Sequence, residues 1–217
     1  MIQACAGIGY AHRAGLVHRD LNPNNVLLFE GSLWRAKLSG VRPRAPRPVA
    51  GGEGTKLEGT TPGFTSPQVL RTGEASARDD VYSLGAIVFR CIAGRMPFPE
   101  HDHPDRAHVE PRSKAPRRLA DLVPNLPQDL YDLVGSLLAH DPESRPADAV
   151  SACRHLHDLA RAFGSYDQIT DADLDARTPA LPPHFELTPP PRPAPEIGAP
   201  WDLKVDPDAL KGPFVLL

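Results

Sequence analysis

The sequence predicts a mainly α-helical domain with one small β element. Apolar residues recur at helical spacing over residues 1–14, 79–93, 127–139 and 146–163. Strand-like runs are short, and they occur near residues 26–29 and 34–38. An apolar fraction of 41% and a charged fraction of 24% are ordinary for a globular chain, so we expect a packed core.

The first part of the chain predicts a helix, two strands and a loop. The helix covers residues 1–14, and Gly15 supplies a helix stop. After a polar loop, the apolar run at 26–29 and the segment at 34–38 predict two paired strands. From Gly40 to Gly63 the sequence is rich in Gly, Pro, Arg and Thr without periodicity, which predicts a long irregular loop.

The second part of the chain is predicted to be built around one central helix. Asp79–Ala93 is the most apolar segment, and its apolar residues surround much of the helix circumference, which is typical of a buried helix. Pro97 is predicted to end it. Residues 100–118 are polar and predict no definite element. The two later helices are separated by a turn at Asp141–Pro146.

The composition divides the chain into two regions. Residues 1–163 are expected to form the folded domain, whereas residues 164–217 are rich in proline and are expected to be disordered or extended. Pro190–Pro193 fits a P-x-x-P pattern, which docks into aromatic grooves of partner proteins. The alternative is that this tail is simply solvated.

Charge and cysteine content exclude several classes of protein. A net charge of -3 gives no reason to expect nucleic acid or an anionic membrane as a partner. No apolar run approaches the roughly 20 residues that span a bilayer, and the start lacks the pattern of a secretory signal. Cys5, Cys91 and Cys153 lie far apart, so neither a disulfide framework nor a zinc site is expected. These features predict a cytoplasmic protein with buried free thiols.

Several motifs follow one another in a fixed order. His18 to Asn25 reads HRDLNPNN, which is an H-R-D-L-x-x-x-N pattern between two short apolar runs. Gly59–Gln68 reads GTTPGFTSPQ, Asp80–Gly85 reads DVYSLG, and Asp141–Pro146 reads DPESRP. Together with Gly94–Phe98, these segments resemble the catalytic loop and the later motifs of the protein kinase family. The local style is that of its bacterial Ser/Thr members.

The resemblance covers residues 8–150 and implies a fold and a reaction. The fold is the C-terminal lobe of the two-lobed α+β kinase domain. The reaction is transfer of a phosphoryl group from ATP to Ser or Thr of a protein substrate, with Mg²⁺ as the metal. ATP, Mg²⁺ and a protein partner are therefore expected from the resemblance alone.

The resemblance also assigns candidate roles to the residues at the expected reaction centre. Asp20 would be the catalytic base, and Asn25 would be a weak magnesium ligand and cofactor contact. Arg19 would receive a phosphate from the activation loop. Thr61 would lie in the segment that faces the substrate.

Four further residues are implied to be structural anchors. His18 would pack in the core, and Asp80 would hold the backbone of the catalytic loop by hydrogen bonds. Arg145 would pair with the glutamate of the family's A-P-E motif, but Gln68 stands there. We therefore expect the buried ion pair to be reduced to a contact with a single charge, which leaves the arginine costly to bury.

Three departures from the family affect phosphate and metal binding. The chain begins inside the helix before the catalytic loop, so no N-terminal lobe is expected within it. The segment from Ala36 to Arg42 resembles the strand and exit around the D-F-G motif with Asp and Phe lost, and no Asp or Glu occurs from Gly31 to Gly52. Asn22 stands where Ser/Thr kinases carry a lysine on the transferring phosphate, so a charge-assisted contact is lost.

Three functions remain open on these grounds. The leading interpretation is a truncated Ser/Thr kinase homologue that is inactive as this chain. The second is an active kinase whose N-terminal lobe is encoded upstream of a misplaced start. The third is a pseudokinase scaffold or binding module whose proline-rich tail recruits a protein partner.

Without an N-terminal lobe, apolar groups around Leu27 and Leu28 should be exposed.

Overall fold

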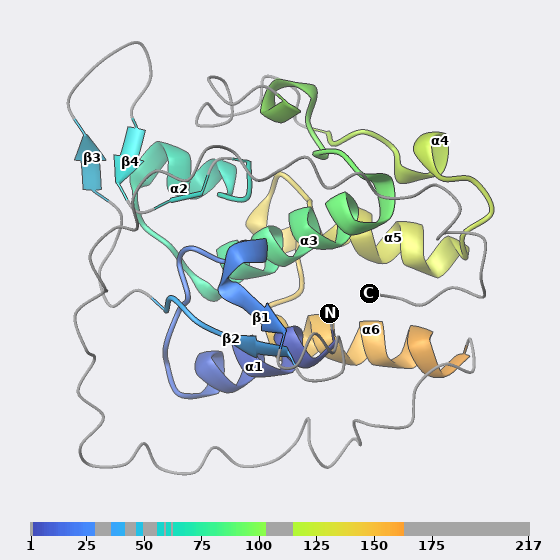
Figure 1. The fold of residues 1–217 in the computed structure, drawn as a ribbon, viewed down its shortest axis with the longest axis horizontal. Helices are drawn as coiled ribbons and strands as arrows, with labels where there is room; N and C mark the ends of the chain where they lie inside the picture. The colour runs from blue at the N-terminus through green and yellow to red at the C-terminus, as the bar shows by residue number, and fades with distance from the viewer. Residues whose placement is uncertain are drawn as a thin grey trace.

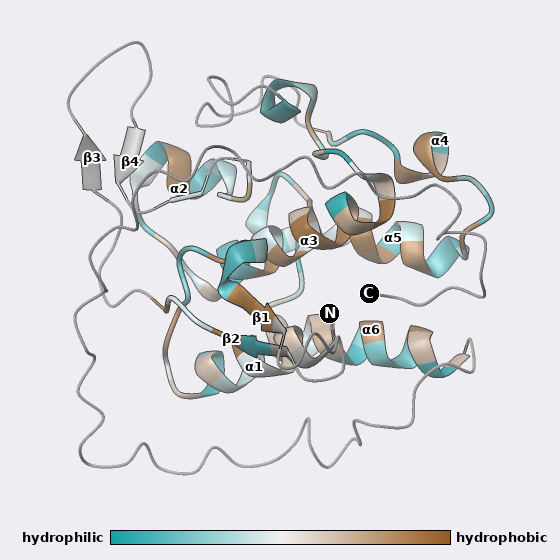
Figure 2. Cartoon of the chain, in the orientation of Figure 1, coloured by the Kyte–Doolittle hydropathy of each residue, from teal (hydrophilic) through white to brown (hydrophobic). Residues whose placement is uncertain are grey.

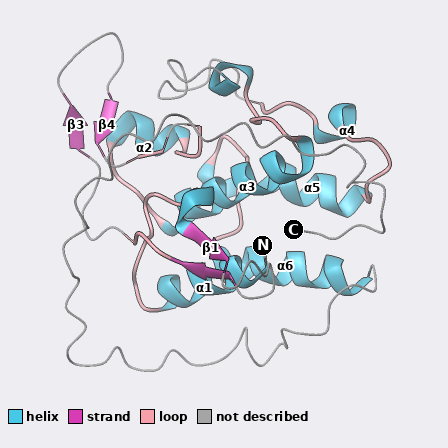
Figure 3. Ribbon diagram, in the orientation of Figure 1, coloured by secondary structure: helices cyan, strands magenta, loops and turns pink. Residues whose placement is uncertain are grey.

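The fold is mainly helical with short strands, as predicted (Figures 1 and 3). The structure, a computed structural model, describes residues 2–28, 36–41, 47–49, 56–58, 60–61, 63–102 and 115–162. The helices are α1 (Ile2–Arg13), α2 (Pro67–Thr72), α3 (Ala77–Ala93), α4 (Leu119–Leu122), α5 (Gln128–Leu137) and α6 (Ala149–Ala162). Single 3-10 turns occur at Pro23–Asn25, Pro99–Asp102 and Pro142–Ser144. The strands are β1 (Val26–Leu28), β2 (Ala36–Leu38), β3 (Arg47–Val49) and β4 (Lys56–Glu58).

Helix α3 is the centre of the packing, and it contacts α1, α4, α5 and α6. Its residues from Asp79 to Phe89 are all buried, which confirms the predicted central helix. A capping box between Ser76 and Asp79 begins the helix. Its end differs from the prediction, because Gly94 adopts a left-handed conformation (φ 70°) three residues before Pro97. Glycine takes that conformation without steric cost, so the helix stops before the proline is reached.

The core is continuous from α1 through α3 to α5 and α6. Figure 2 shows hydrophobic residues concentrated on α3, while hydrophilic residues lie along α6. Helix α6 buries one face, which includes Ala152, Cys153 and Leu156, and it packs closely on α1. Because α1 also contacts β2, the first helix joins the small sheet to the helical core.

The sheet elements were only partly predicted. Strands β1 and β2 pair antiparallel with Val26 opposite Leu38, which confirms two paired strands near the predicted positions. The predicted irregular loop from Gly40 to Gly63 was wrong in one part, because β3 and β4 form a second antiparallel pair there. Each of these strands has three residues, which is too short for alternation of apolar and polar side chains to be recognised.

Two short helices, α2 and the single turn α4, were not predicted. Helix α2 begins at Ser66, whose side chain accepts a hydrogen bond from the Val69 amide, and Pro67 occupies its first turn. It ends at Gly73 in the left-handed conformation, with φ 72°. An N-cap serine, a proline in the first turn and a terminal glycine are recognisable helix signals, but only six residues lie between them.

The predicted exposure of Leu27 and Leu28, the predicted tail and the predicted absence of a membrane span can each be compared with the described residues. Leu27 on β1 is 51% exposed, as predicted, whereas the side chain of Leu28 lies outside the described residues. The described part of the chain ends at Ala162, so the predicted tail and its P-x-x-P segment also lie outside it. Within the described residues, no helix has the length and apolar character needed to cross a membrane.

The contact between α3 and α5 depends on the absence of a side chain at Gly85. A Cβ atom there would lie 2.7 Å from Leu137 Cβ and 3.2 Å from the Leu137 carbonyl carbon. We predict that Gly85→Ala lowers the free energy of unfolding by about 1–3 kcal/mol, because it overpacks the core. Urea denaturation followed by circular dichroism would measure the change.

Gly135 is the matched control for this prediction, because it also lies in a helix but has open space around its Cα. Gly135→Ala should raise the free energy of unfolding by about 0.5–1 kcal/mol through helix propensity alone. Equal effects of the two substitutions would contradict the close approach of α3 and α5.

Candidate active site

The backbone of the predicted catalytic loop is held by Asp80 at the start of α3. Its Oδ2 accepts a hydrogen bond from the His18 amide at 2.7 Å, and its Oδ1 accepts one from the Arg19 amide at 2.9 Å. Arg19 has a φ of 69°, a left-handed conformation that is uncommon for residues other than glycine. The two hydrogen bonds hold that conformation, so Asp80 lies where the expected anchor should be.

A third donor to Asp80 was missed by sequence reasoning. His12 on α1 donates from Nε2 to Asp80 Oδ2 at 2.9 Å. Its Nδ1 accepts a hydrogen bond from the Ala149 amide at 3.2 Å, so the ring carries its proton on Nε2 and is neutral. His12 therefore connects the catalytic loop to the first turn of α6. The sequence pattern placed His12 only within the helix predicted over residues 1–14, with Ala11 or His12 as the last residue of its apolar face.

Asp20, the candidate base, is engaged by two neighbours. Thr61 donates from its hydroxyl to Asp20 Oδ1 at 2.7 Å. The Asn22 amide nitrogen lies 3.2 Å from Asp20 Oδ1 and 2.8 Å from Thr61 Oγ1. Asp20 is 8% exposed. The structure thus brings three of the singled-out residues together in one hydrogen-bonded cluster.

Asn22 also has a structural role that the lysine expected from the family cannot take over. Its Oδ1 accepts a hydrogen bond from the Asn24 amide and caps the 3-10 turn at Pro23–Asn25. Its Nδ2 donates to the Asp20 carbonyl at 2.9 Å. Both ends of the amide are used within the loop, and an ammonium group has no acceptor with which to replace the cap.

Asn25, the candidate metal ligand, faces a glycine. Asn25 Nδ2 donates to the Asp20 carbonyl at 2.8 Å. A Cβ atom on Gly40 would lie 2.7 Å from Asn25 Oδ1, and Gly40 has a φ of 78°. Ser39, between β2 and Gly40, is fixed next to the loop by two hydrogen bonds. Its amide donates to the Asn25 carbonyl at 2.9 Å. Its carbonyl accepts a hydrogen bond from His18 Nε2 at 2.9 Å.

The residues around Asn25 do not fit a magnesium site. Mg²⁺ requires near-octahedral oxygen coordination and is usually held by one or two carboxylates together with substrate phosphates. Gly40 supplies no carboxylate beside Asn25. In the parts of the chain that the structure describes, no group of three His, Cys, Asp or Glu side chains could hold a metal ion. The expected magnesium contact of Asn25 therefore has no partner at Gly40, which lies just after β2.

Gln68 and Arg145 meet as expected, but the expectation of an uncompensated arginine was wrong. Arg145 is 3% exposed, and its Nη2 donates to Gln68 Oε1 at 2.6 Å. Gln68 Nε2 donates to the His140 carbonyl at 2.6 Å. Asp79 supplies the missing negative charge, because its Oδ1 lies 3.5 Å from Arg145 Nη1. Burial lowers the pKa of Arg145, and Asp79 opposes that shift.

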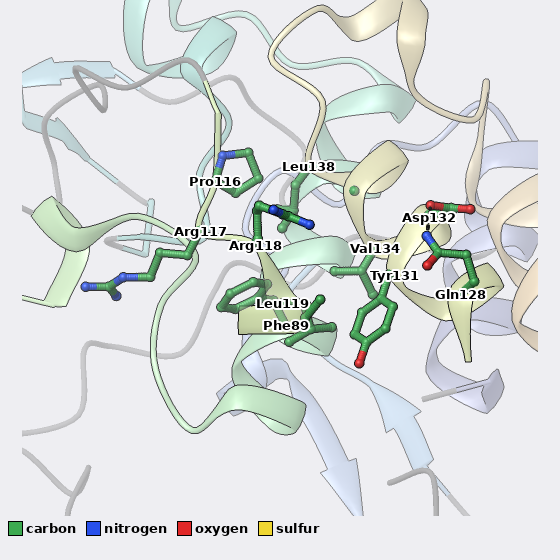
Figure 4. A pocket seen from close by; sticks show the side chains of 12 residues that line it. Phe89, Pro116, Arg117, Arg118, Leu119, Gln128, Tyr131, Asp132, Val134 and Leu138 are labelled. Carbon is green, nitrogen blue, oxygen red and sulfur yellow. Dashed lines mark hydrogen bonds between the residues drawn. The ribbon is translucent and has the colours of Figure 1, made fainter. Parts of the chain in front are cut away.

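A pocket of about 270 Å³ lies between α3, α4 and α5 (Figure 4). Phe89, Leu119, Val134 and Leu138 form part of its lining, and Arg117 and Arg118 also border it. The residues singled out in the sequence do not line it. The pocket is thus separate from the Asp20 cluster.

The bonds of His12 generate a prediction about stability. His12→Ala removes a donor from Asp80, whose side chain is 2% exposed, and leaves the Ala149 amide without its acceptor. We predict a loss of about 1–3 kcal/mol in the free energy of unfolding, measured by urea denaturation. The exposed His155 on α6 is the control, and His155→Ala should change stability by less than about 0.5 kcal/mol. A neutral His12→Ala substitution would contradict the coupling through His12.

Comparisons with known proteins agree with the motif order. The sequence matches the family model described as protein kinase domain over residues 1–157. It is 33% identical over 155 residues to the serine/threonine-protein kinase PknL of Mycobacterium tuberculosis (strain ATCC 25618 / H37Rv). The aligned region covers 71% of this chain and 38% of PknL. It is 32% identical over 158 residues to the serine/threonine-protein kinase/endoribonuclease IRE1 of Oryza sativa subsp. japonica. This aligned region covers 71% of this chain and 17% of IRE1.

A third relative is the probable serine/threonine-protein kinase pknA2 of Bifidobacterium longum (strain NCC 2705). It is 26% identical over 154 residues, with 71% of this chain and 20% of that protein covered. The chain thus spans 38% of the length of PknL and less of the other two. The matched region includes the loop held by Asp80 and the contact between Gln68 and Arg145. The chain belongs to the protein kinase family.

Proposed function

We propose that this chain is a Ser/Thr protein kinase homologue, corresponding to the C-terminal lobe, that does not transfer phosphate by itself. The observation that carries the proposal is the contact between Asn25 and Gly40. Kinases hold their metal ions between the catalytic-loop asparagine and the aspartate of the D-F-G motif. Here the backbone next to the asparagine carries no side chain.

The loop keeps the geometry of a catalytic loop without the chemistry that surrounds it. Asp20 lies in a cluster with Thr61, and its loop is anchored by Asp80. A positioned base contributes about 10²–10⁴ in rate. That contribution requires a phosphoryl donor held in line with the attacking hydroxyl, and stabilisation of charge on the transferring group usually contributes more to the rate than the base does. The base alone is therefore insufficient for turnover.

Asn22 supports the same proposal from the other side of the loop. The family's lysine brings a positive charge to the transferring phosphate, whereas the Asn22 amide is neutral and bonded to Asp20, Thr61 and the Asn24 amide. Asn22 and Gly40 both lie within the chain. The proposed loss of phosphoryl transfer therefore rests on these two residues and does not depend on whether further residues precede them.

A second candidate is an active kinase with an N-terminal lobe encoded upstream of residue 1. The observation that favours it is Leu27, a large apolar residue that is 51% exposed on β1 directly after the catalytic loop. Such a residue is suited to being covered by a second lobe or by a bound group. The glycine at position 40 still predicts weak activity for that longer protein. In-frame coding sequence upstream with a glycine-rich loop and a V-A-I-K lysine would favour this candidate.

A transfer assay with radiolabelled ATP, Mg²⁺ and a generic protein substrate tests the proposal. We predict that the substrate incorporates the same background amount of label with the wild-type chain and with Asp20→Ala. The reason is that no phosphoryl donor is held beside Asp20 for the base to act on. An active Ser/Thr kinase in parallel would establish that the substrate and conditions permit transfer.

Transfer by the wild-type chain that Asp20→Ala abolishes would overturn the proposal. Circular dichroism of both proteins is needed beside the assay, because Asp20 bonds Thr61 and its loss could perturb the loop. The scaffold alternative is separated by affinity capture of a partner with and without residues 165–217. A partner lost on removal of those residues would favour the scaffold, and none would count against it.

A further inference from the structure

The pocket between α3, α4 and α5 has a fixed wall and an apolar floor (Figure 4). Arg117 holds the wall in place. Its amide donates to the Pro97 carbonyl at 2.8 Å, and its Nη1 lies 2.8 Å from Asp102 Oδ2. The floor consists of buried side chains: Phe89, Leu119, Val134 and Leu138. The protein therefore forms the pocket before anything binds in it.

Gly135 on α5 leaves the pocket wide enough for one large side chain. It lines the pocket, and a Cβ atom built on it would meet no packed neighbour within 4 Å. An apolar cavity of about 150 Å³ holds a benzene ring, so a pocket of about 270 Å³ has room for the two fused rings of tryptophan. Tryptophan is also one of the side chains that most often anchor protein contacts by filling such pockets.

Two opposite charges border the pocket. Arg118 is exposed, and among the residues that the structure describes no carboxylate pairs with its guanidinium, whereas Arg117 beside it is paired. Asp132 on α5 is also exposed, and its Oδ1 accepts a hydrogen bond from Gln128 Nε2 at 2.8 Å. In Figure 4 the side chains of Arg118 and Asp132 lie on opposite sides of Val134. An occupant that carries an acid and a base beside an aromatic anchor matches both charges.

The sequence of this chain contains such a segment after Ala162. Trp201–Val205 reads WDLKV. Among the aromatic residues that follow Ala162, Trp201 alone has both an acidic and a basic residue within the next three positions. The segment lies outside the described residues, so its sequence alone carries this step. It supplies one large apolar anchor with Asp202 and Lys204 next to it.

The connection from α6 to this segment is long enough to reach the pocket. Residues 163–200 separate Ala162, the last residue of α6, from Trp201. A random coil of this length has an average end-to-end distance of roughly 35 Å, which exceeds the diameter of a small domain, about 30 Å. Because anchor and pocket belong to one chain, they meet at an effective concentration in the millimolar range. Even a weak contact is therefore populated.

We propose that Trp201 of the same chain inserts into the pocket between α3, α4 and α5, with Asp202 against Arg118 and Lys204 against Asp132. The pocket is separate from the Asp20 cluster, so this contact does not depend on whether the chain transfers phosphate. It returns the proline-rich region, including Pro190–Pro193, to the surface of the folded domain.

Tryptophan fluorescence of the full chain tests the insertion. The chain has two tryptophans, so Trp34→Phe leaves Trp201 as the only indole. In that background we expect a blue-shifted emission and weak quenching by iodide, because the indole is shielded from water. Adding Gly135→Phe fills the pocket with a ring without a clash at Cβ. Emission should then shift to the red, and iodide quenching should rise to that of free N-acetyltryptophanamide.

Gly135→Ala is the matched control, because it changes the same position and leaves most of the pocket open. It should keep the blue-shifted emission and the weak quenching. Circular dichroism of the variants would establish that Gly135→Phe keeps the helical fold.

Charge reversal tests the orientation without a change in the pocket floor. Arg118→Asp and Asp202→Arg should each increase quenching, since an exposed ion pair changes the ratio of docked to undocked chain by up to about fivefold. The two substitutions together should restore the protection. Arg95 is exposed and does not line the pocket, so Arg95→Asp should change nothing.

Three results would overturn the proposal. The first is equal quenching of Trp201 with an open pocket and with Gly135→Phe. The second is a double reversal of Arg118 and Asp202 that protects Trp201 no better than either single reversal. The third is protection that rises with protein concentration, which would assign the pocket to the tail of a second copy.

Discussion

The structure depends on one buried carboxylate, that of Asp80. A buried anion is tolerated only when hydrogen bonds replace its lost hydration, and Asp80 receives them from the amides of His18 and Arg19 and from the His12 ring. These donors come from the catalytic loop and from α1, while His12 in turn is bonded to α6 through Ala149. One side chain of the central helix thereby fixes the loop, holds Arg19 in a left-handed conformation and ties both ends of the described chain together.

The candidate site divides into a retained half and an altered half. On the retained side, Asp20 and Thr61 are bonded, and the loop is anchored to α3. On the altered side, Gly40 lies next to Asn25 just after β2, and Asn22 is neutral and is bonded to the Asn24 amide and to Asp20. The contacts of the loop with the core satisfy buried polar groups and contribute to stability whether or not phosphate is transferred. The anchoring of the loop therefore does not require metal chemistry at Asn25.

Sequence reasoning predicted what local pattern determines. The periodicity of α1, α3 and α5 and the order of the motifs predicted the helical fold and the family, and both were confirmed. It missed the three-residue strands β3 and β4, where no pattern can accumulate. It also missed Asp79 as the counter-charge of Arg145 and the bond from His12 to Asp80. These two contacts join distant segments, and only the packing of the helices brings their atoms together.

Our proposal is that the chain preserves the loop but lacks the means to hold a metal beside it. Its sharpest test is calorimetric titration of ATP, with and without Mg²⁺, into the wild-type chain, Gly40→Asp and Gly40→Asn. Asp and Asn tolerate a left-handed φ. Both must displace the Asn25 side chain, because a Cβ on Gly40 would lie 2.7 Å from Asn25 Oδ1. Since Asp and Asn have the same shape, comparing the two variants isolates the added charge. We expect no Mg²⁺-dependent gain in ATP affinity for the wild-type chain and Gly40→Asn, and a gain for Gly40→Asp. Wild-type binding that requires Mg²⁺ and is lost in Asn25→Ala would contradict the proposal.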